Sequence, residues 1–502
     1  MGDSIVGRYL RGTPADRIDP GALAFYAQLD AVGAVAPTVA GSVARELADQ
    51  RSNIKLIASE NYSSLAVQLA QGNLLTDKYA EGYPGHRFYA GCDNVDVIES
   101  EAVDLAKRLF GAEHAYVQPH SGADANLVAF LSILATRVES PALERLGQKD
   151  PAKLPDSDWA KLRAELHDQR LLAMDYYSGG HLTHGYRHNF SARLFDAYSY
   201  RVDRETRLLD LDALRQQVLE VRPLVLLAGY SAYPRKINFA RMREMADEVG
   251  AVLMVDMAHF AGLVAGGVFT GEYDPVPHAH VVTSTTHKTL RGPRGGIVLC
   301  TEEFAPAVDK GCPMILGGPL PHAMAAKAVA FTEATRPEFR EYAAKVVENC
   351  RTLADELQAH KIQVLTGGTD NHLLLVDVAA TYGITGRQAE SALRECGLTL
   401  NRNSLPYDEN GPWYTSGLRL GTPAVTTLGM GAAEMAEIAD IIAAVLAGVK
   451  PTSKVDASGE TVVSKAKYEL DAAITAGARQ RVNDLLHRYP VYPEIDLGLV
   501  QF

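Results

Sequence analysis

Residues 252–259, VLMVDMAH, and residues 283–296, TSTTHKTLRGPRGG, carry the signals that decide the fold. The first stretch contains an apolar run that ends at Asp256, and the second continues the predicted strand that begins at Val281 into Lys288 and a glycine-rich turn. An acid at the end of a buried strand stands where open α/β sheets place groups that face a ligand. A lysine becomes a nucleophile when burial or a nearby positive charge lowers the pKa of its ammonium, as a crowded turn at a strand's exit can do. The alternatives are a helix N-cap for Asp256 and a solvated surface side chain for Lys288.

A third stretch, residues 118–126 with the sequence QPHSGADAN, follows an apolar run and opens a predicted helix. Its small residues Ser121, Gly122 and Ala123 let backbone N–H groups at the helix N-terminus approach a phosphate, which the helix dipole also favours. The alternative is an ordinary Ser-Gly helix cap. A phosphate-binding turn, then a strand-end acid, then a lysine is the order typical of the aspartate-aminotransferase-like fold of pyridoxal-phosphate enzymes. The sequence contains no Walker-type P-loop and no dinucleotide-binding fingerprint.

Between about residues 94 and 298, short apolar runs alternate with amphipathic helices. This pattern predicts a mostly parallel sheet that is covered on both faces. One predicted helix, Val95–Phe110, ends at Gly111, a suitable C-cap residue. We therefore predict an α/β fold: a large domain with the mostly parallel sheet of the fold-type I pyridoxal-phosphate enzymes, and a smaller α+β C-terminal domain. The predicted strands are Ala115–Val117, Leu171–Met174, Pro223–Gly229, Ala251–Val255 and Val281–Ser284.

Changes in composition predict the domain boundaries. Residues 137–170 are charged, contain three prolines and lack a clear core stripe, so we predict a surface excursion there. A long helix from Phe339 to His360 is predicted near the start of the small domain, and an amphipathic helix near Ala476–Arg488 close to the C-terminus. The predicted division is an N-terminal helical arm at residues 1–60, a large cofactor-binding domain at 61–336, a small domain at 337–450 and a C-terminal extension at 451–502.

The composition argues against several classes of function. The 502-residue chain has a formal net charge of −12, and nucleic-acid binding needs a basic face, so no nucleic-acid partner is expected. The N-terminal sequence has no apolar signal core and no apolar run is long enough to span a bilayer, so we expect a cytoplasmic protein without membrane contact. The five cysteines lack the spacing of a metal site or a disulfide framework, which indicates reduced thiols and no bound metal.

Seven motifs are dispersed between about residues 50 and 430 in the sequence. They are residues 56–61 LIASEN, 78–85 KYAEGYPG, 179–185 GGHLTHG, 255–259 VDMAH, 285–289 TTHKT, 367–372 GGTDNH and 416–424 SGLRLGTPA. Their sequences and their order closely resemble the serine hydroxymethyltransferase family. Members interconvert serine plus tetrahydrofolate with glycine plus 5,10-methylenetetrahydrofolate. The resemblance therefore implies a pyridoxal-phosphate-dependent glycine hydroxymethyltransferase of one-carbon metabolism.

The resemblance implies which residues bind the cofactor. Lys288 would hold pyridoxal 5'-phosphate as an imine and be displaced by the substrate, Asp256 would pair with the pyridinium nitrogen, and His181 would stack on the ring. His259 would lie near the phenolic oxygen of the ring, with Ser231 close by. The other implied cofactor-binding residues are Ser121, Gly122, Ala123, His287, Tyr79, Gly317 and Gly318.

The same resemblance implies which residues bind the substrates. Arg419 would hold the substrate carboxylate by two parallel hydrogen bonds, assisted by Ser59, and so fix which Cα bond stands perpendicular to the ring. Glu81 would be a protonated acid near the hydroxymethyl group. The other implied substrate-binding residues are Tyr89, Phe88, Gly180, Leu182 and Asn403. The implied catalytic residues are Lys288, Glu81, His287, Asp256 and His181.

The resemblance also implies an oligomer. Tyr79 and Tyr89 resemble residues that reach the site from a neighbouring subunit, so we expect a homodimer or a dimer of dimers that binds serine, glycine and tetrahydrofolate. The chain departs from the family pattern at Ala123, where many members have serine. It departs again at Phe88, where a tyrosine is usual beside the folate ring, and at Tyr176, where many members have leucine.

Three other functions stay open from the sequence. A folate-independent aldolase or transaldolase acting on β-hydroxy amino acids would share the imine and the carboxylate anchor. An α-methylserine hydroxymethyltransferase would use the same site. A non-catalytic RNA-binding protein would use the fold as a platform, but the acidic charge and the intact set of Lys288, Asp256 and Glu81 argue against that reading.

Overall fold

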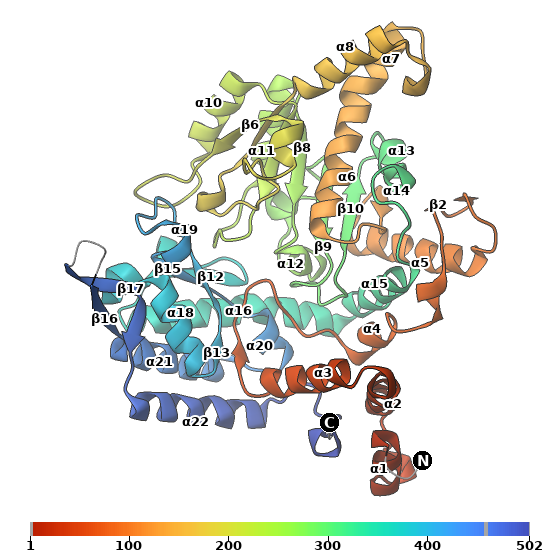
Figure 1. Ribbon diagram of the computed structural model, residues 1–502. Coiled ribbons are helices and arrows are strands. Elements are labelled where there is room, and N and C mark those ends of the chain that lie inside the picture. The colour runs from red at the N-terminus through yellow and green to blue at the C-terminus, as the bar shows by residue number, and fades with distance from the viewer. Residues whose placement is uncertain (1–3, 456–459, 501–502) are drawn as a thin grey trace.

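The central sheet carries both stretches that decide the fold. The computed structural model describes residues 4–455 and 460–500 (Figure 1). Within these ranges seven strands form one sheet, whose neighbours are parallel except that β10 runs antiparallel to β4 and to β9. The predicted α/β fold with a mostly parallel sheet is therefore confirmed. In sheet order the strands are β4 (His114–Tyr116), β10 (Gly296–Cys300), β9 (Val281–Thr285), β8 (Val252–Asp256), β7 (Val225–Gly229), β5 (Arg170–Met174) and β6 (Asp196–Tyr200).

The predicted strands correspond to β4, β5, β7, β8 and β9, with ends that differ by at most two residues. The sequence pattern does not predict β6 or β10. β6 is one of the two edge strands, and because its side chains are mostly exposed it has no continuous apolar run. β10 begins at Gly296, inside the glycine-rich turn, where the turn signal hides the start of the strand.

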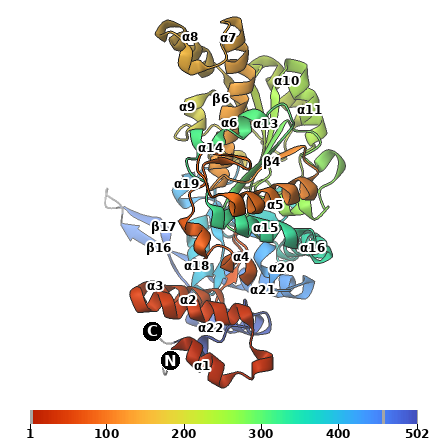
Figure 2. The same cartoon turned by 90° about the vertical axis from the view of Figure 1, so that its right-hand side faces the viewer.

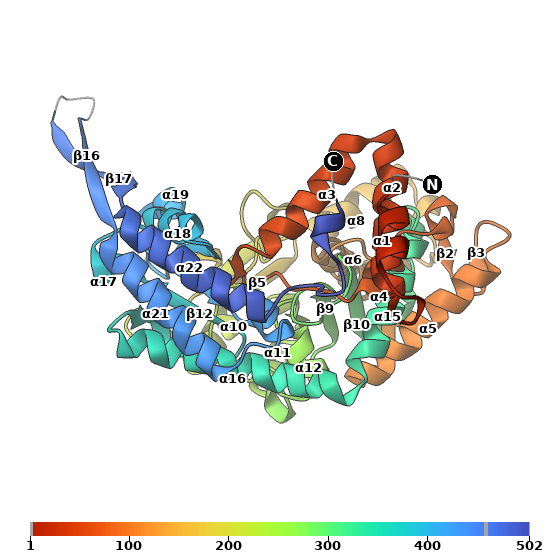
Figure 3. The ribbon, with the colours of Figure 1, turned by 90° about the horizontal axis from the view of Figure 1, so that it is seen from below.

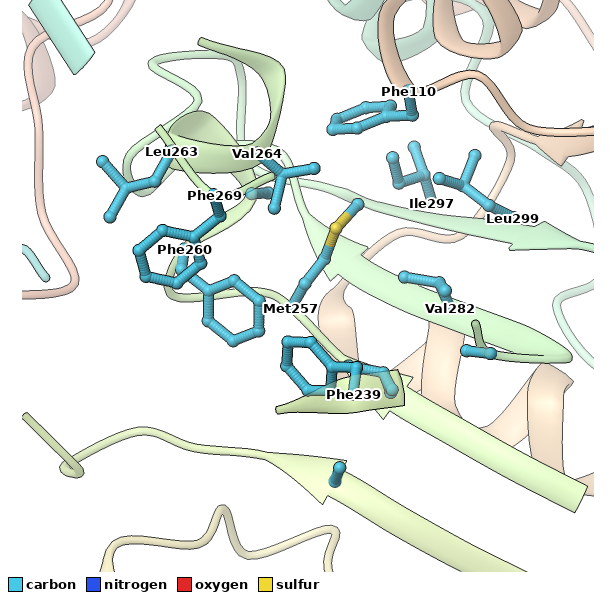
Figure 4. Packing of buried hydrophobic residues seen from close by; sticks show 14 of the residues in the cluster. Phe110, Phe239, Met257, Phe260, Leu263, Val264, Phe269, Val282, Ile297 and Leu299 are labelled. Carbon is cyan, nitrogen blue, oxygen red and sulfur yellow. The ribbon is translucent and has the colours of Figure 1, made fainter. Parts of the chain in front are cut away.

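Alternate side chains of the strands enter two separate cores, one on each face of the sheet. Leu226 and Ala228 of β7 face the core formed with α5 (Asp93–Phe110), whereas Val225 and Leu227 face the core under α6 (Gly122–Leu134). Figure 4 shows Phe110, Ile297 and Leu299 packed together in the first core. The predicted helix is α5, and it ends at Gly111 in the left-handed conformation, as expected of a C-cap glycine. Both faces are therefore covered.

A second sheet belongs to the C-terminal half. Four strands form it within the described residues, and its paired strands are antiparallel. The predicted long helix is α16, which starts at a proline as helices often do. This sheet and the helices packed on it share one hydrophobic core, to which Ile54 and Leu56 of the N-terminal segment also belong. The elements are β11 (Gln363–Val364), β12 (Leu373–Asp377), β15 (Gly417–Gly421), β14 (Asn401–Asn403), α16 (Pro337–Ala359), α18 (Gly386–Glu395) and α21 (Ala432–Gly448).

The two ends of the chain lie on the same side of the molecule (Figures 1 and 2). The Tyr26 hydroxyl in α2 accepts a hydrogen bond from the Asp496 N–H at 2.6 Å, and the Arg51 guanidinium donates to the carbonyls of Val491 and Ile495, each at 2.9 Å. These contacts attach the C-terminal segment to the N-terminal helices. The N-terminal helices are α1 (Ile5–Gly12), α2 (Pro20–Val35) and α3 (Pro37–Gln50), and the C-terminal segment follows α22 (Ala472–Arg488).

Two elements project from the body. Helices α7 (Ser140–Arg145) and α8 (Asp156–His167) form a spur at the top of Figures 1 and 2, with a small core of Ala142, Leu143 and Leu162. The hairpin of β16 (Lys450–Val455) and β17 (Thr461–Glu469) extends from the C-terminal half, as Figure 3 shows from below. None of the described helices is both long and apolar enough to cross a membrane.

Candidate active site

A cavity of about 570 Å³ lies where the ends of β8 and β9 approach the second sheet. Asp256 ends β8, Lys288 follows β9, and Arg419 belongs to β15, so three distant parts of the sequence meet there. The carboxyl ends of parallel strands are the expected location for a ligand in such a sheet. The predicted site residues that line the cavity are Ser59, Ser121, Gly122, Ala123, Gly180, His181, Leu182, Ser231, Asp256, His259, His287, Lys288, Asn403 and Arg419.

Lys288 has the properties of a nucleophile. Its side chain is 9 % exposed, and its amine has no hydrogen-bond partner among the described residues. Burial lowers the pKa of the Lys288 ammonium to about 8; the Asp256 charge opposes this lowering, and the Arg419 charge adds to it. The Asn61 amide fixes the backbone by donating to the Lys288 carbonyl at 3.0 Å. The alternative of a solvated surface lysine is therefore wrong.

Asp256 is a buried carboxylate held by three donors. Asn126 donates to one carboxylate oxygen at 2.9 Å, His184 lies 3.2 Å from the same oxygen, and the Ala258 N–H donates to the other at 3.0 Å. Burial alone raises the pKa of Asp256, but the hydrogen bond and charge of His184 and the bond from Asn126 outweigh it and hold the pKa below its ordinary value. The helix that follows, α12 (Ala261–Ala265), has Phe260 as its N-cap, so Asp256 is not a helix cap.

His181 presents a neutral ring to the cavity. Its Nδ1 atom lies 2.7 Å from the Thr183 hydroxyl, and Asn126 donates to that hydroxyl at 2.7 Å. Burial lowers the pKa of His181 to about 4, so the ring is uncharged at neutral pH. Ligand atoms of His181, His184 and Asp256 lie within 4.8 Å of one another, a spacing that a metal ion could bridge. The hydrogen bond between His184 and Asp256 already accounts for this closeness.

Two glycines near Asp256 and His181 allow neighbouring backbone segments to approach each other closely. A Cβ at Gly180 would lie 2.1 Å from the Met174 carbonyl oxygen. A Cβ at Gly229 would lie 2.0 Å from the Asp256 carbonyl oxygen, and Gly229 has φ of +115°. Any other residue at these positions would displace backbone that carries site residues.

His259 is paired with a histidine that the sequence did not indicate as a site residue. Its Nδ1 lies 3.1 Å from Nε2 of His372, and both rings are buried. Burial lowers the pKa of His259 well below its ordinary value and that of His372 to about 3, so both rings are neutral and one donates to the other. The motif at residues 367–372 contains His372, but only the fold brings it against His259.

The turn before α6 can accept a phosphate. Ser121 is the N-cap of α6, where its hydroxyl accepts a hydrogen bond from the Asp124 N–H at 3.1 Å. The free N–H groups and the dipole of this helix favour an anion. The ring nitrogen Nδ1 of His287 is buried nearby in the cavity lining without a partner among the described residues. A free amine, an ionised acid, a flat neutral ring and a helix N-terminus fit the aldehyde, ring nitrogen, ring face and phosphate of pyridoxal phosphate.

Arg419 can bind an anionic substrate. Its guanidinium donates to the Ser231 carbonyl at 2.6 Å and to the Asn401 side-chain oxygen at 3.1 Å. Burial lowers the pKa of Arg419 to about 10, and in the described part of the chain no carboxylate forms an ion pair with it. A charge in this position is stabilised when a ligand supplies the missing carboxylate.

Comparison with known proteins agrees with this geometry. The sequence model of the serine hydroxymethyltransferase family matches residues 32–143 and 162–442. The chain belongs to the serine hydroxymethyltransferase family. A serine hydroxymethyltransferase of Treponema pallidum is 58% identical over 496 residues, which cover 99% of this chain and 86% of the relative. One of Salinispora tropica is 57% identical over 95% of this chain and 98% of the relative, and one of Mycolicibacterium smegmatis is 57% identical over 96% of each.

Six residues expected from the serine hydroxymethyltransferase resemblance do not line the cavity. They form a separate surface group around the hairpin of β2 (Gly82–Tyr83) and β3 (His86–Arg87). The Tyr79 hydroxyl donates to Glu81 at 3.2 Å, and the Tyr79 and Tyr89 rings are 5.0 Å apart. A Cβ at Gly318 would lie 3.3 Å from the Tyr79 ring. We call this group the tyrosine hairpin; its members are Tyr79, Glu81, Phe88, Tyr89, Gly317 and Gly318.

A buried ion pair holds the backbone of the tyrosine hairpin in place. Arg87 pairs with Glu99 of α5, and their side chains are only 5% and 2% exposed. Arg87 also donates to the carbonyls of Ala80 and Gly82 at 3.0 and 2.9 Å. Burial raises the pKa of Glu99, although the charge of Arg87 opposes this, so the carboxylate depends on its partner. These contacts fix the backbone that carries Tyr79 and Glu81.

Replacing Arg87 with methionine is expected to lower the free energy of unfolding by about 3–5 kcal/mol, because Glu99 would be buried without its cation. Urea unfolding followed by circular dichroism measures the change. Arg108→Met on the same helix as Glu99 is the control, since Arg108 is 67% exposed and should cost less than about 1 kcal/mol. Equal effects of the two substitutions would contradict a supporting role for the Arg87–Glu99 pair.

Proposed function

We propose that the protein transfers the hydroxymethyl carbon of serine to tetrahydrofolate, reversibly, giving glycine and 5,10-methylenetetrahydrofolate with pyridoxal 5'-phosphate as cofactor. Serine hydroxymethyltransferases 57–58% identical to the chain support this reaction. The observation that carries it is the meeting in one cavity of the amine of Lys288, which has no hydrogen-bond partner among the described residues, with the guanidinium of Arg419, which has no ion-pair partner there.

The cofactor would bind in the cavity, against the side that is formed by the N-terminus of α6, the end of β8 and the residues after β9. When bound, pyridoxal phosphate supplies an electron-withdrawing ring that weakens the bonds at the substrate Cα. The ionised carboxylate of Asp256 would hold a proton on the ring nitrogen, and the neutral ring of His181 would stack on the ring face. The N–H groups after Ser121 would bind the phosphate.

Arg419 would decide which bond breaks. A guanidinium that grips a carboxylate by two parallel hydrogen bonds fixes the rotation of the substrate about Cα. Ser59 lines the same cavity and would assist the carboxylate. Leu182, Gly180 and Asn403 also line the cavity and would contact the folate ring. With the rotation about Cα fixed in this way, the bond to the hydroxymethyl group would be the one that breaks.

The tyrosine hairpin would complete the site of a partner subunit in a homodimer or a dimer of dimers. Tyr79, Phe88 and Tyr89 are 55%, 68% and 47% exposed, which is unusual for large aromatic side chains. Glu81 would then act as a proton-transferring acid near the hydroxymethyl group of the neighbouring site. This arrangement explains why residues implied together by one family lie in two places on one chain.

Glu81→Gln is expected to reduce tetrahydrofolate-dependent serine cleavage by about 100-fold while pyridoxal phosphate still binds, because glutamine cannot transfer a proton. Steady-state rates and cofactor absorbance measure the two effects. Glu60→Gln is the control, since Glu60 lines the cavity but is already paired with Lys55 at 2.8 Å. Equal loss of cofactor binding and cleavage would show that Glu81 is structural.

Mixing Glu81→Gln with Lys288→Ala subunits tests the shared site. A dimer with one subunit of each kind has one site in which both Lys288 and Glu81 are intact. An equal mixture, unfolded and refolded together, should regain about a quarter of the wild-type activity. No recovery in a mixture shown to contain mixed dimers would place Glu81 in the site of its own subunit.

Serine cleavage with and without tetrahydrofolate tests the reaction itself. We expect glycine formation to depend strongly on tetrahydrofolate. Equal rates under both conditions would favour a folate-independent aldolase, and preference for α-methylserine would favour that substrate. Protein that binds no pyridoxal phosphate would contradict the proposed function altogether.

We further propose a cytoplasmic location, which the five free and buried cysteines support because reduced thiols are usual there. We also propose the division into an arm at 1–60, a large domain at 61–336, a small domain at 337–450 and an extension at 451–502. Separate hydrophobic cores around the two sheets support the boundary between the large and small domains.

A further inference from the structure

Lys327 lies in α15 (Pro321–Ala334), outside the cavity, and its side chain is 1 % exposed. Its amine donates to three backbone carbonyls, those of Val117 at 2.6 Å, Pro119 at 2.9 Å and Gly296 at 2.9 Å. A buried lysine without a contacting carboxylate is costly, so its retention calls for a specific role.

The three acceptors select the charged form of this lysine. A carbonyl only accepts hydrogen bonds, and an ammonium has three N–H groups, whereas a neutral amine has two. Burial lowers the pKa of Lys327 to about 7, and the charges of Glu99 and Asp124 oppose that lowering. In its charged form Lys327 is a positive charge inside the protein that three carbonyl dipoles satisfy.

Two of the carbonyls bound by Lys327, those of Val117 and Pro119, belong to the turn that precedes α6, and the third is that of Gly296, the first residue of β10. Pro119 also accepts a hydrogen bond from the Gly296 N–H at 2.9 Å, and a Cβ at Gly296 would lie 2.2 Å from the Ser121 carbonyl oxygen. On the other side of the turn, the Gln118 side chain donates to Glu99 at 2.7 Å. The segment that leads to the phosphate-binding N–H groups is thus fixed from two sides.

We infer that Lys327 is a positioning residue for the cofactor phosphate: it fixes the turn from Val117 to Ser121 and adds a buried positive charge behind the N-terminus of α6. This inference rests on the proposed function, because it requires that a phosphate group binds at that terminus. Lys327 does not touch the reacting atoms.

Binding of pyridoxal phosphate is compared with binding of pyridoxal, which has the same ring without the phosphate. Lys327→Met should raise the Kd for pyridoxal phosphate at least about tenfold and change the Kd for pyridoxal less than about twofold. If Lys327 had only a structural role, its replacement would weaken the binding of both ligands equally, and that result would overturn the inference. Lys345→Met, a partly exposed lysine on α16, is the control and should change neither Kd.

Gly295→Ala provides a second variant, because a Cβ at Gly295 would lie 2.5 Å from Cε of Lys327 and displace its side chain. Like Lys327→Met, this substitution should raise the Kd for pyridoxal phosphate more than the Kd for pyridoxal. If neither Lys327→Met nor Gly295→Ala folds, Lys327 is a folding determinant and the inference is wrong. If wild-type protein binds neither ligand, the proposed function fails first, which separates the two outcomes.

Discussion

Replacing Lys288 with alanine is expected to abolish serine turnover. The Lys288 amine is the group in the cavity that can join covalently to an aldehyde, and its ammonium pKa is lowered to about 8. At pH 7 on the order of a tenth of this amine is uncharged, against fewer than about one in a thousand for a solvated lysine. Alanine removes the nucleophile and leaves the rest of the cavity in place.

The measurement combines rates with chemical trapping. Borohydride reduction followed by peptide mapping should place the cofactor on Lys288 in wild-type protein and nowhere in the variant. In the wild-type apoprotein, covalent attachment should increase with pH around a midpoint near 8, because the uncharged amine is the attacking form. Lys345→Ala should leave both results unchanged. Trapping at a different lysine would remove Lys288 from its proposed role.

Replacing Arg419 with alanine is expected to lower kcat/KM for serine by about 30-fold to several thousand-fold. This corresponds to roughly 2–5 kcal/mol for the loss of one partner of a desolvated, charge-assisted pair. The effect should fall mainly on KM, since the substrate carboxylate loses its anchor before the reaction begins. Arg419→Lys should recover only part of the loss, because an ammonium cannot form two parallel hydrogen bonds.

Arg402 offers a matched control for Arg419. It lines the same cavity on the neighbouring strand β14, but its guanidinium already pairs with Glu390 at 2.6 Å. Arg402→Ala should therefore change the KM for serine by less than about threefold. If Arg402→Ala and Arg419→Ala had similar effects on KM, general positive charge in the cavity would explain serine binding and Arg419 would not be its specific anchor.

The sequence predicted the parts of the fold that local patterns control. The apolar run of β8 is continuous because both faces of this strand are buried, and its end located Asp256; β9 is buried throughout as well, and Lys288 follows its end. The partners of Asp256 could not be predicted in the same way. Asn126 and His184 reach its carboxylate from α6 and from a distant loop, so only the assembled sheet brings them together.

Lys327 shows the same limit more strongly. Its surroundings in the sequence are those of an ordinary helix, and the usual expectation for a helical lysine is exposure to solvent. Its burial follows from the position of α15 in the assembled fold, where the Lys327 amine reaches the carbonyls of Val117, just after β4, and of Gly296, at the start of β10, which no local pattern records. The family resemblance already implied that Tyr79 and Tyr89 reach the site of a neighbouring subunit, but the position of Glu81 and Phe88 beside them, outside the cavity of their own chain, required the structure.

The close backbone approach at Gly180 and Gly229 constrains any attempt to change the substrate range by laboratory evolution. A mutant library that varied these two positions would yield mainly misfolded clones, since a side chain at either would collide with carbonyl oxygens. Tyr176 and Leu182, which line the cavity and are 40% and 42% exposed, are the productive positions to randomise for bulkier amino acids or altered pterins.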